Sequence, residues 1–220
     1  MKQISLIALT VILIASCNSE DTEKDHNKRY DIESAVVKYN TNMMGIQSES
    51  VLYFKDYGRM ECTDSKAKHM GQESHSRRFI KDGYAYTLDM NNKSGSKMKT
   101  EKLPDSVMNP EDIDFNDIPK GIKKRYNIQL QGEETVIGKT CKVYTMEMKP
   151  GKAKQIISVW KNIPLRIEFV DEGIQIITTA TEIKENPDLP KEIFTVPDDF
   201  TISEYKGETE ENEASSEQPS

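Results

Sequence analysis

Apolar and polar residues alternate through most of the middle of the chain, the pattern of strands with one buried and one solvated face. The run 165–169 (LRIEF) alternates without a break, and Tyr84, Tyr86 and Leu88 would share one face of another strand. Turn signals such as Asp82-Gly83 separate the runs. The pattern predicts an antiparallel meander of short strands joined mostly by hairpins, at residues 34–41, 47–55, 59–63, 77–81, 84–90, 96–100, 140–148, 155–160, 165–170 and 174–183.

The stretch 103–129 breaks this alternation with three prolines. Pro110 is followed by two acids, which suits the first turn of a helix. Apolar residues at near-helical spacing come next: Ile113, Phe115 and Ile118. A basic group then follows at Lys120, Lys123, Lys124 and Arg125. The stretch therefore predicts short helices lying across a curved sheet, and a second brief helix is expected near residues 190–194.

The first residues have the form of an export signal. A short basic start precedes residues 4–15, a run of twelve apolar or uncharged residues that is too short to span a bilayer comfortably. The run ends at Ile14-Ala15-Ser16-Cys17, which resembles the lipobox of bacterial lipoproteins. That resemblance implies cleavage before Cys17 and acylation of this residue, and several acyl chains on one residue give durable membrane attachment. The alternative is an ordinary cleaved signal with a chance cysteine.

The remaining boundaries follow from composition. Residues 1–16 are predicted to be the signal peptide and 17–29 a lipidated tether, because the latter are polar and without periodicity. Residues 30–203 form one domain, and 204–220 are predicted to be an acidic disordered tail. Asn18 and the acids after it favour the outer membrane over the inner one, at its periplasmic face or at the cell surface. The formal net charge of -7 argues against a nucleic-acid partner.

A family resemblance rests on the second half of the domain. It is carried by the runs 138–141 (GKTC), 159–165 (VWKNIPL), 187–190 (PDLP) and 194–197 (FTVP). These runs, in this order of strands, are similar to the half-open-barrel proteins related to the outer-membrane lipoprotein carrier and receptor (LolA-like and LolB-like proteins), in an uncharacterised branch. The resemblance implies a mainly β (α+β) fold, a strongly bent antiparallel half-barrel around an apolar cavity. It also implies that residues 103–129 are a short helical lid.

Sequence motifs for chemistry are scarce. No nucleophile elbow, zinc-protease motif, phosphate-binding loop or dinucleotide fingerprint occurs, so we predict a non-enzymatic protein without a cofactor. Cys62, His69, Met70 and His75 combine ligand types that copper or zinc accepts, but their spacing matches no metal motif and basic residues separate them. We interpret them as part of a polar loop and predict no metal site.

Once Cys17 is acylated, Cys62 and Cys141 are the remaining thiols in an oxidising compartment. A disulfide between them would close a loop of about 80 residues and restrict the unfolded chain by about 4–5 kcal/mol in the entropy model. Two buried free thiols are the alternative.

Two functions fit this sequence. In the first, a lipid or another hydrophobic molecule binds inside the half-barrel, since a bent sheet cannot fill its own concave face. The cavity candidates are Phe54, Tyr86, Val143, Ile157, Trp160, Ile167 and Ile176, with Ile113, Phe115 and Ile118 facing inward from the lid. In the second, the domain has a filled core and is a surface-displayed module that binds an envelope protein.

Overall fold

The computed structural model describes residues 28–100, 113–149 and 153–205. Twelve strands make up most of this part of the chain: β1 (Ala35–Met43), β2 (Ile46–Lys55), β3 (Met60–His69), β4 (Gln72–Lys81), β5 (Tyr84–Asp89), β6 (Ser94–Lys99), β7 (Gln129–Val136), β8 (Lys139–Lys149), β9 (Ala153–Trp160), β10 (Ile163–Asp171), β11 (Ile174–Glu185) and β12 (Thr201–Glu204). The helical elements are short: η1 (Asp56–Gly58), α1 (Lys120–Arg125) and η4 (Lys191–Phe194).

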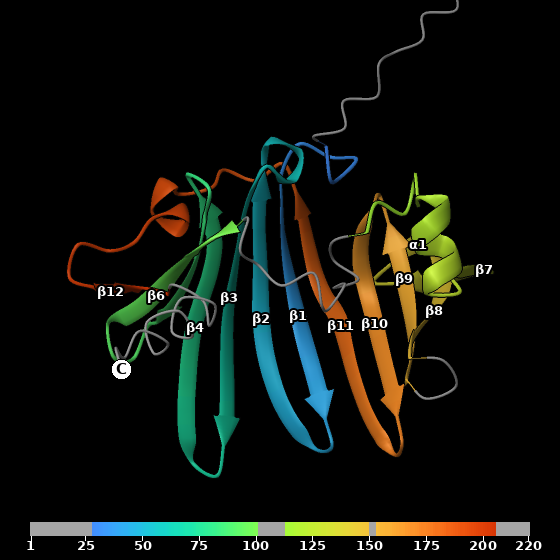
Figure 1. Ribbon diagram of the computed structural model, residues 1–220, viewed down its shortest axis with the longest axis horizontal. Helices are drawn as coiled ribbons and strands as arrows, with labels where there is room; N and C mark the ends of the chain where they lie inside the picture. Colours follow the sequence, from blue (N-terminus) through green and yellow to red (C-terminus); the bar gives the residue numbers. More distant parts are fainter. Residues whose placement is uncertain (1–27, 101–112, 150–152, 206–220) are drawn as a thin grey trace, which may run out of the picture.

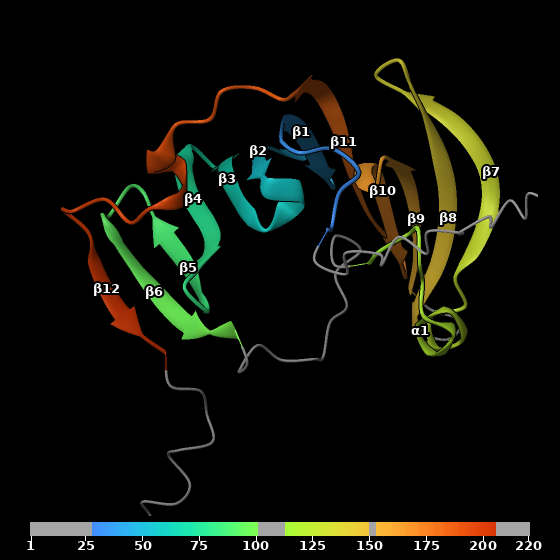
Figure 2. The same ribbon diagram turned by 90° about the horizontal axis from the view of Figure 1, so that it is seen from above.

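All twelve strands belong to one sheet, in the order β12-β6-β5-β4-β3-β2-β1-β11-β10-β9-β8-β7. Every pairing is antiparallel except that of β12 with β6. Figure 1 shows the long central strands side by side, and Figure 2 shows the sheet bending into an arc. The predicted mainly β, bent antiparallel fold with a short helix in mid-chain is therefore confirmed.

The two faces of the sheet follow from the register. Residues that pair across neighbouring strands point to the same side of the sheet. Ala35 pairs with Phe54, and Ile157 pairs with Ile167 and Tyr144; we call the side to which these residues point the inner face. The N-terminal segment (residues 28–34) and residues 113–128 lie on this side of the arc (Figure 2). Side chains one residue out of phase, such as Cys62 and its partner Phe79, belong to the outer face.

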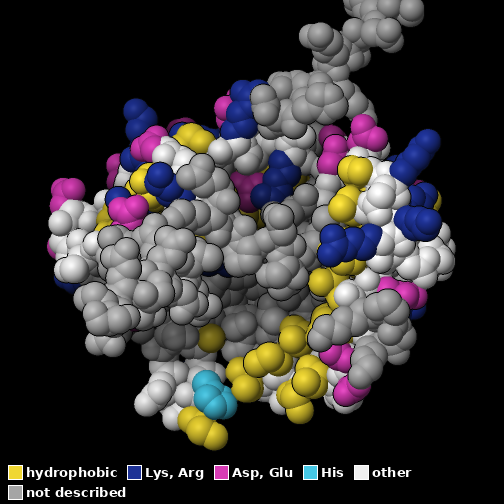
Figure 3. Space-filling model, in the orientation of Figure 1, with side chains coloured by type: hydrophobic (Ala, Val, Ile, Leu, Met, Phe, Trp, Pro, Cys, Tyr) yellow, Lys and Arg dark blue, Asp and Glu magenta, His cyan; other side chains and the backbone are white. Residues whose placement is uncertain are grey.

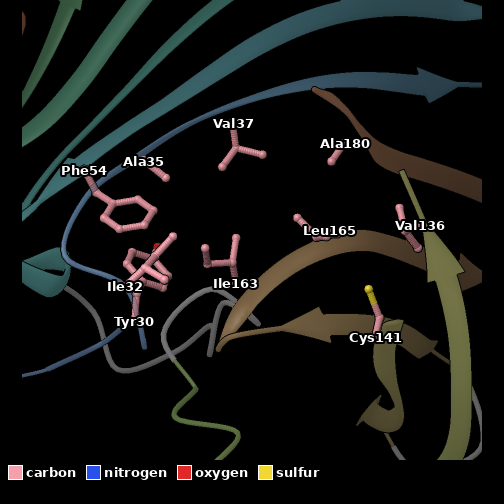
Figure 4. Packing of buried hydrophobic residues seen from close by; sticks show 10 residues of the cluster. All are labelled: Tyr30, Ile32, Ala35, Val37, Phe54, Val136, Cys141, Ile163, Leu165 and Ala180. Carbon is pink, nitrogen blue, oxygen red and sulfur yellow. The ribbon is translucent and has the colours of Figure 1, made fainter. Parts of the chain in front are cut away.

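Three clusters of buried apolar residues hold the sheet together. The first joins Tyr30 and Ile32 of the N-terminal segment to the centre of the sheet; Figure 4 shows these residues gathered with Phe54 and Ile163. The second lies on the inner face of β8, β9 and β10 beneath residues 113–128. The third lies on the outer face of β3, β4 and β5, where η4 and the residues after it pack against the sheet. The returning chain after β11 thus covers the outer face of one half of the sheet, whereas the mid-chain segment covers the inner face of the other.

Several predicted boundaries need correction. Residues 113–118 are not helical: they form an irregular segment, which we call the strap, and the helix begins only at Lys120. β3 and β4 extend to His69 and Gln72, so the residues interpreted as a polar loop form a long hairpin. β7 and β12 had no sequence prediction. The helix expected near 190–194 is confirmed as η4, whereas the helix start expected at Pro110 lies outside the described residues.

Candidate functional site

The ten predicted cavity residues do not line a single space. Five of them meet in the cluster on the inner face of β8–β10: Ile113, Phe115, Ile118, Ile157 and Ile167. Phe54 packs against Tyr30 with the rings tilted and their centroids 4.1 Å apart, and Trp160 packs against the same central cluster. Ile176 is half-buried on the inner face.

Two candidates lie on the wrong face for a shared cavity. Tyr86 stacks on Phe79 at 5.0 Å between ring centroids and is covered on the outer face by the η4 region. Val143 pairs with Ser158, one residue out of phase with the inward-facing Ile157. The prediction failed for both because alternation shows which side chains share a face but not which of the two faces is concave.

The apolar end of the inner face is filled by the strap. The ring of Phe115 packs 4.8 Å from that of Tyr144, and the Tyr144 hydroxyl donates to the Phe115 carbonyl. Ile113 and Phe115 are 5% and 6% exposed, so the strap occupies the position expected for a hydrophobic ligand.

Asn162 fixes the strap to its neighbours, and sequence reasoning did not identify this role. Its Oδ1 accepts a 2.8 Å hydrogen bond from the backbone N–H of Phe115. Its Nδ2 donates to the carbonyl of Arg29 and to Asp114 Oδ1. Asn162 is 5% exposed and has a φ of 62°, a left-handed conformation that asparagine tolerates better than most residues. One buried amide therefore connects the β9–β10 turn, the strap and the N-terminal segment.

A small cavity remains at the centre of the inner face. It has a volume of about 40 Å³ and is lined by Tyr30, Tyr39, Ser50, Leu52, Thr63, Pro164, Ile167 and Thr178. Pockets that hold small ligands usually measure about 300–1,000 Å³. In the described conformation this space is too small for an acyl chain.

A larger hollow lies on the inner face at the other end of the sheet, over β4, β5, β6 and β12. Its volume is about 650 Å³. Seven hydroxyl side chains on these strands line it and share the inner face by register; we call this surface the hydroxyl trough: Ser74, Ser76, Thr87, Ser94, Ser96, Thr201 and Ser203.

Most of these hydroxyls are available to a ligand. Ser74 and Ser203 make weak bonds to backbone carbonyls, at 3.5 and 3.3 Å. The other five make no side-chain hydrogen bond to any residue that the structure describes. Asp89, at the edge of the trough, accepts hydrogen bonds from the side chain and backbone of Asn92 and from the backbone of Asn91, and these bonds hold its pKa below the usual range. The trough is thus a polar, hydrogen-bonding surface with a fixed negative charge at its edge.

Cys62 and Cys141 are buried free thiols, so the structure has the alternative to the possible disulfide between them. Cys62 is on β3 and Cys141 on β8, and five strands separate them in the sheet. They also belong to different core clusters, whereas a disulfide requires Cα atoms within about 7 Å. Burial raises the pKa of the Cys62 thiol to about 12. Burial also raises the pKa of the Cys141 thiol above its usual value, so both thiols are poor nucleophiles.

No group of three or more His, Cys, Asp or Glu side chains that could hold a metal ion occurs in the described residues. Of the two histidines in the described ranges, His75 has a carboxylate partner: its Nε2 lies 2.7 Å from Asp64 Oδ1 on the outer face. Arg77 binds the other oxygen of Asp64 at 2.9 Å, so this group is an ion-pair network.

None of the helices in the described ranges is long and apolar enough to cross a membrane. No family model matches the chain, and no curated protein matches it by sequence.

Solved structures share its fold. An uncharacterised conserved protein from Thermus thermophilus is 11% identical with a TM-score of 0.53, over 79% of this chain and 91% of that one. MucB in complex with MucA(peri) is 12% identical with a TM-score of 0.51, over 80% of this chain and 58% of that one, so the chain spans less than two thirds of MucB. A putative outer-membrane lipoprotein-sorting domain from Vibrio parahaemolyticus matches at 10% identity and a TM-score of 0.36, over 77% of this chain and 92% of that one. The chain therefore has a fold that resembles those of the Thermus protein and of MucB.

Proposed function

We propose that this protein is a lipid-anchored, non-enzymatic binding protein of the bacterial envelope that holds a segment of a partner protein in the hydroxyl trough. Cys17, outside the described residues, is the proposed site of acylation and attaches the domain to the outer membrane. The observation that carries the proposal is the trough itself, a hollow of about 650 Å³ in which five of the seven hydroxyls make no side-chain hydrogen bond to a described residue.

The chemistry of the trough suits a polypeptide better than an acyl chain. Hydroxyl groups both donate and accept hydrogen bonds, so a row of them can pair with the N–H and C=O groups of an extended segment. An acyl chain would leave the same hydroxyls desolvated and unpaired, which costs free energy for each one. The solved complex of MucB with MucA(peri), which shares this fold, also supports a protein partner.

Site-specific photocrosslinking in whole cells tests this proposal. A photoreactive amino acid at Thr87 or Ser96, both on the inner face of the trough, is expected to capture one discrete protein. The matched control is Lys81, which is exposed on the outer face of β4. Capture of the same protein with equal yield from Lys81, or of no protein from either trough position, would contradict the proposal.

A hydrophobic ligand is the second candidate, and the central cavity of about 40 Å³ between Tyr39 and Ile167 favours it. This space would have to grow by displacement of the strap, whose apolar residues already occupy the adjacent sheet surface. Native mass spectrometry of protein purified without detergent gives the test. A bound adduct, or uptake of an acyl probe, would support this candidate, and ligand-free protein without uptake would exclude it.

A further inference from the structure

Helix α1 concentrates positive charge in an acidic protein. Its six residues include Lys120, Lys123, Lys124 and Arg125, whereas the whole chain has a net charge of -7. All four side chains are exposed, and none forms an ion pair with another residue of the described ranges. Figure 3 shows basic side chains gathered at the side of the molecule where α1 lies.

The only apolar residue of α1 packs against the protein and is not available to a partner. Ile122 is half-buried and packs against the apolar cluster on the inner face of β8–β10. The guanidinium of Arg125 lies 5.4 Å from the centre of the Tyr126 ring, which leaves its donors free. The exposed side of α1 is therefore a purely electrostatic surface, and its partner must be anionic.

Hydrogen bonds place α1 close to the N-terminal segment. Asn116 of the strap donates to both oxygens of Asp31, at 3.0 and 3.1 Å. Lys120 follows Asn116 by four residues, so about 14 Å of chain at most separates their Cα atoms. The ten residues 18–27, between Cys17 and the described domain, can extend over at most about 36 Å. A membrane attached at Cys17 would therefore lie within reach of α1.

Described acids lie close to α1 on both sides of it in the chain, and none forms an ion pair with its four cations. Glu147 follows the helix: its backbone N–H donates to the Tyr126 carbonyl, and its side chain accepts a hydrogen bond from Asn127. Asp31 accepts a hydrogen bond from Asn116, and Asp114 accepts hydrogen bonds from Asn116 and Asn162. Asp117 lies three residues before the first residue of α1. These acids reduce the net charge of the region, but α1 itself contains no acid.

We propose that α1 binds the anionic headgroups of the membrane that holds Cys17 and so orients the domain on that membrane. A lipid chain combined with a basic patch is a common two-signal mode of membrane attachment. The inference rests on the proposed anchoring for its geometry, but the binding of headgroups by α1 can be measured without the lipid.

Vesicle flotation with the unacylated mature chain, residues 18–220, tests this inference. We expect binding to phosphatidylcholine vesicles that contain phosphatidylglycerol, no binding to phosphatidylcholine alone, and release at high ionic strength, because salt screens exposed charges. A variant with Lys120, Lys123, Lys124 and Arg125 all replaced by Gln should bind at least about tenfold more weakly. The matched control replaces four lysines of the other half of the molecule by Gln and so changes the net charge equally: Lys66, Lys68, Lys81 and Lys191.

Three results would overturn the assignment. These are no binding to the anionic vesicles, equal weakening in both variants, and binding that appears only after deletion of residues 206–220, which would assign α1 to the acidic tail. None of these results bears on the trough, because crosslinking from Thr87 is measured on the anchored protein with α1 intact. The two proposals can therefore fail separately.

Discussion

Replacement of Asn162 by alanine tests whether one amide holds the strap on the sheet. The change removes three hydrogen bonds, each with a net contribution of about 1 kcal/mol, and leaves the N–H of the buried Phe115 without its acceptor. Alanine at a φ of 62° adds about 1 kcal/mol of backbone strain. We therefore expect Asn162→Ala to lower the free energy of unfolding by about 3–4 kcal/mol, measured by urea denaturation.

Asn162→Gly is the matched control, because glycine adopts the left-handed conformation without strain. It should lower the free energy of unfolding by about 2–3 kcal/mol, so that the difference between the two variants reports the backbone alone. Hydrogen exchange at the Phe115 amide should accelerate more than exchange in the central strands, since the strap loses its direct contact. A loss below about 1 kcal/mol with unchanged exchange at Phe115 would refute the role assigned to Asn162.

Three other outcomes are expected. Alkylation without reductant should modify neither Cys62 nor Cys141 in the folded protein and both in urea; a disulfide would leave both unmodified in urea. Gly95→Ala should lower the free energy of unfolding by about 1–3 kcal/mol, because its Cβ would lie 2.7 Å from a backbone oxygen, and a neutral result in thermal denaturation would contradict this packing. Met44→Asn and Met70→Asn should each raise the free energy of unfolding by up to about 1 kcal/mol, since both methionines are exposed and left-handed in hairpin turns; lower melting temperatures would contradict the assigned turns.

The regular alternation of the chain was enough to predict the sheet. In β10 each apolar residue of the run 165–169 is followed by a charged one or ends the run, so the strand and its pairing with β9 and β11 follow from the sequence. β7 was missed because its sequence, QLQGEETV, is almost entirely polar and exposed and has no alternation to detect. β12 was missed because it is four residues long and pairs with β6, more than 100 positions earlier in the chain. Local patterns identify strands that bury one face, and they fail for edge strands held by pairing alone.

The polarity of the inner face depends on contacts that no local pattern records. In β4 the inward-facing Ser74 and Ser76 alternate with His75 and Arg77, so both faces are polar and neither is marked as concave. The outer side chains of β3 to β5 are buried only because the chain returns as η4 and covers them, which the spacing within those strands cannot show. The same return leaves the serines and threonines of these strands on the open side of the sheet. The strap, in turn, covers the apolar end of the inner face with Phe115 and its neighbours. The inner face over β4, β5, β6 and β12 is therefore polar, and this is why we propose a protein segment for the hydroxyl trough in place of an acyl chain.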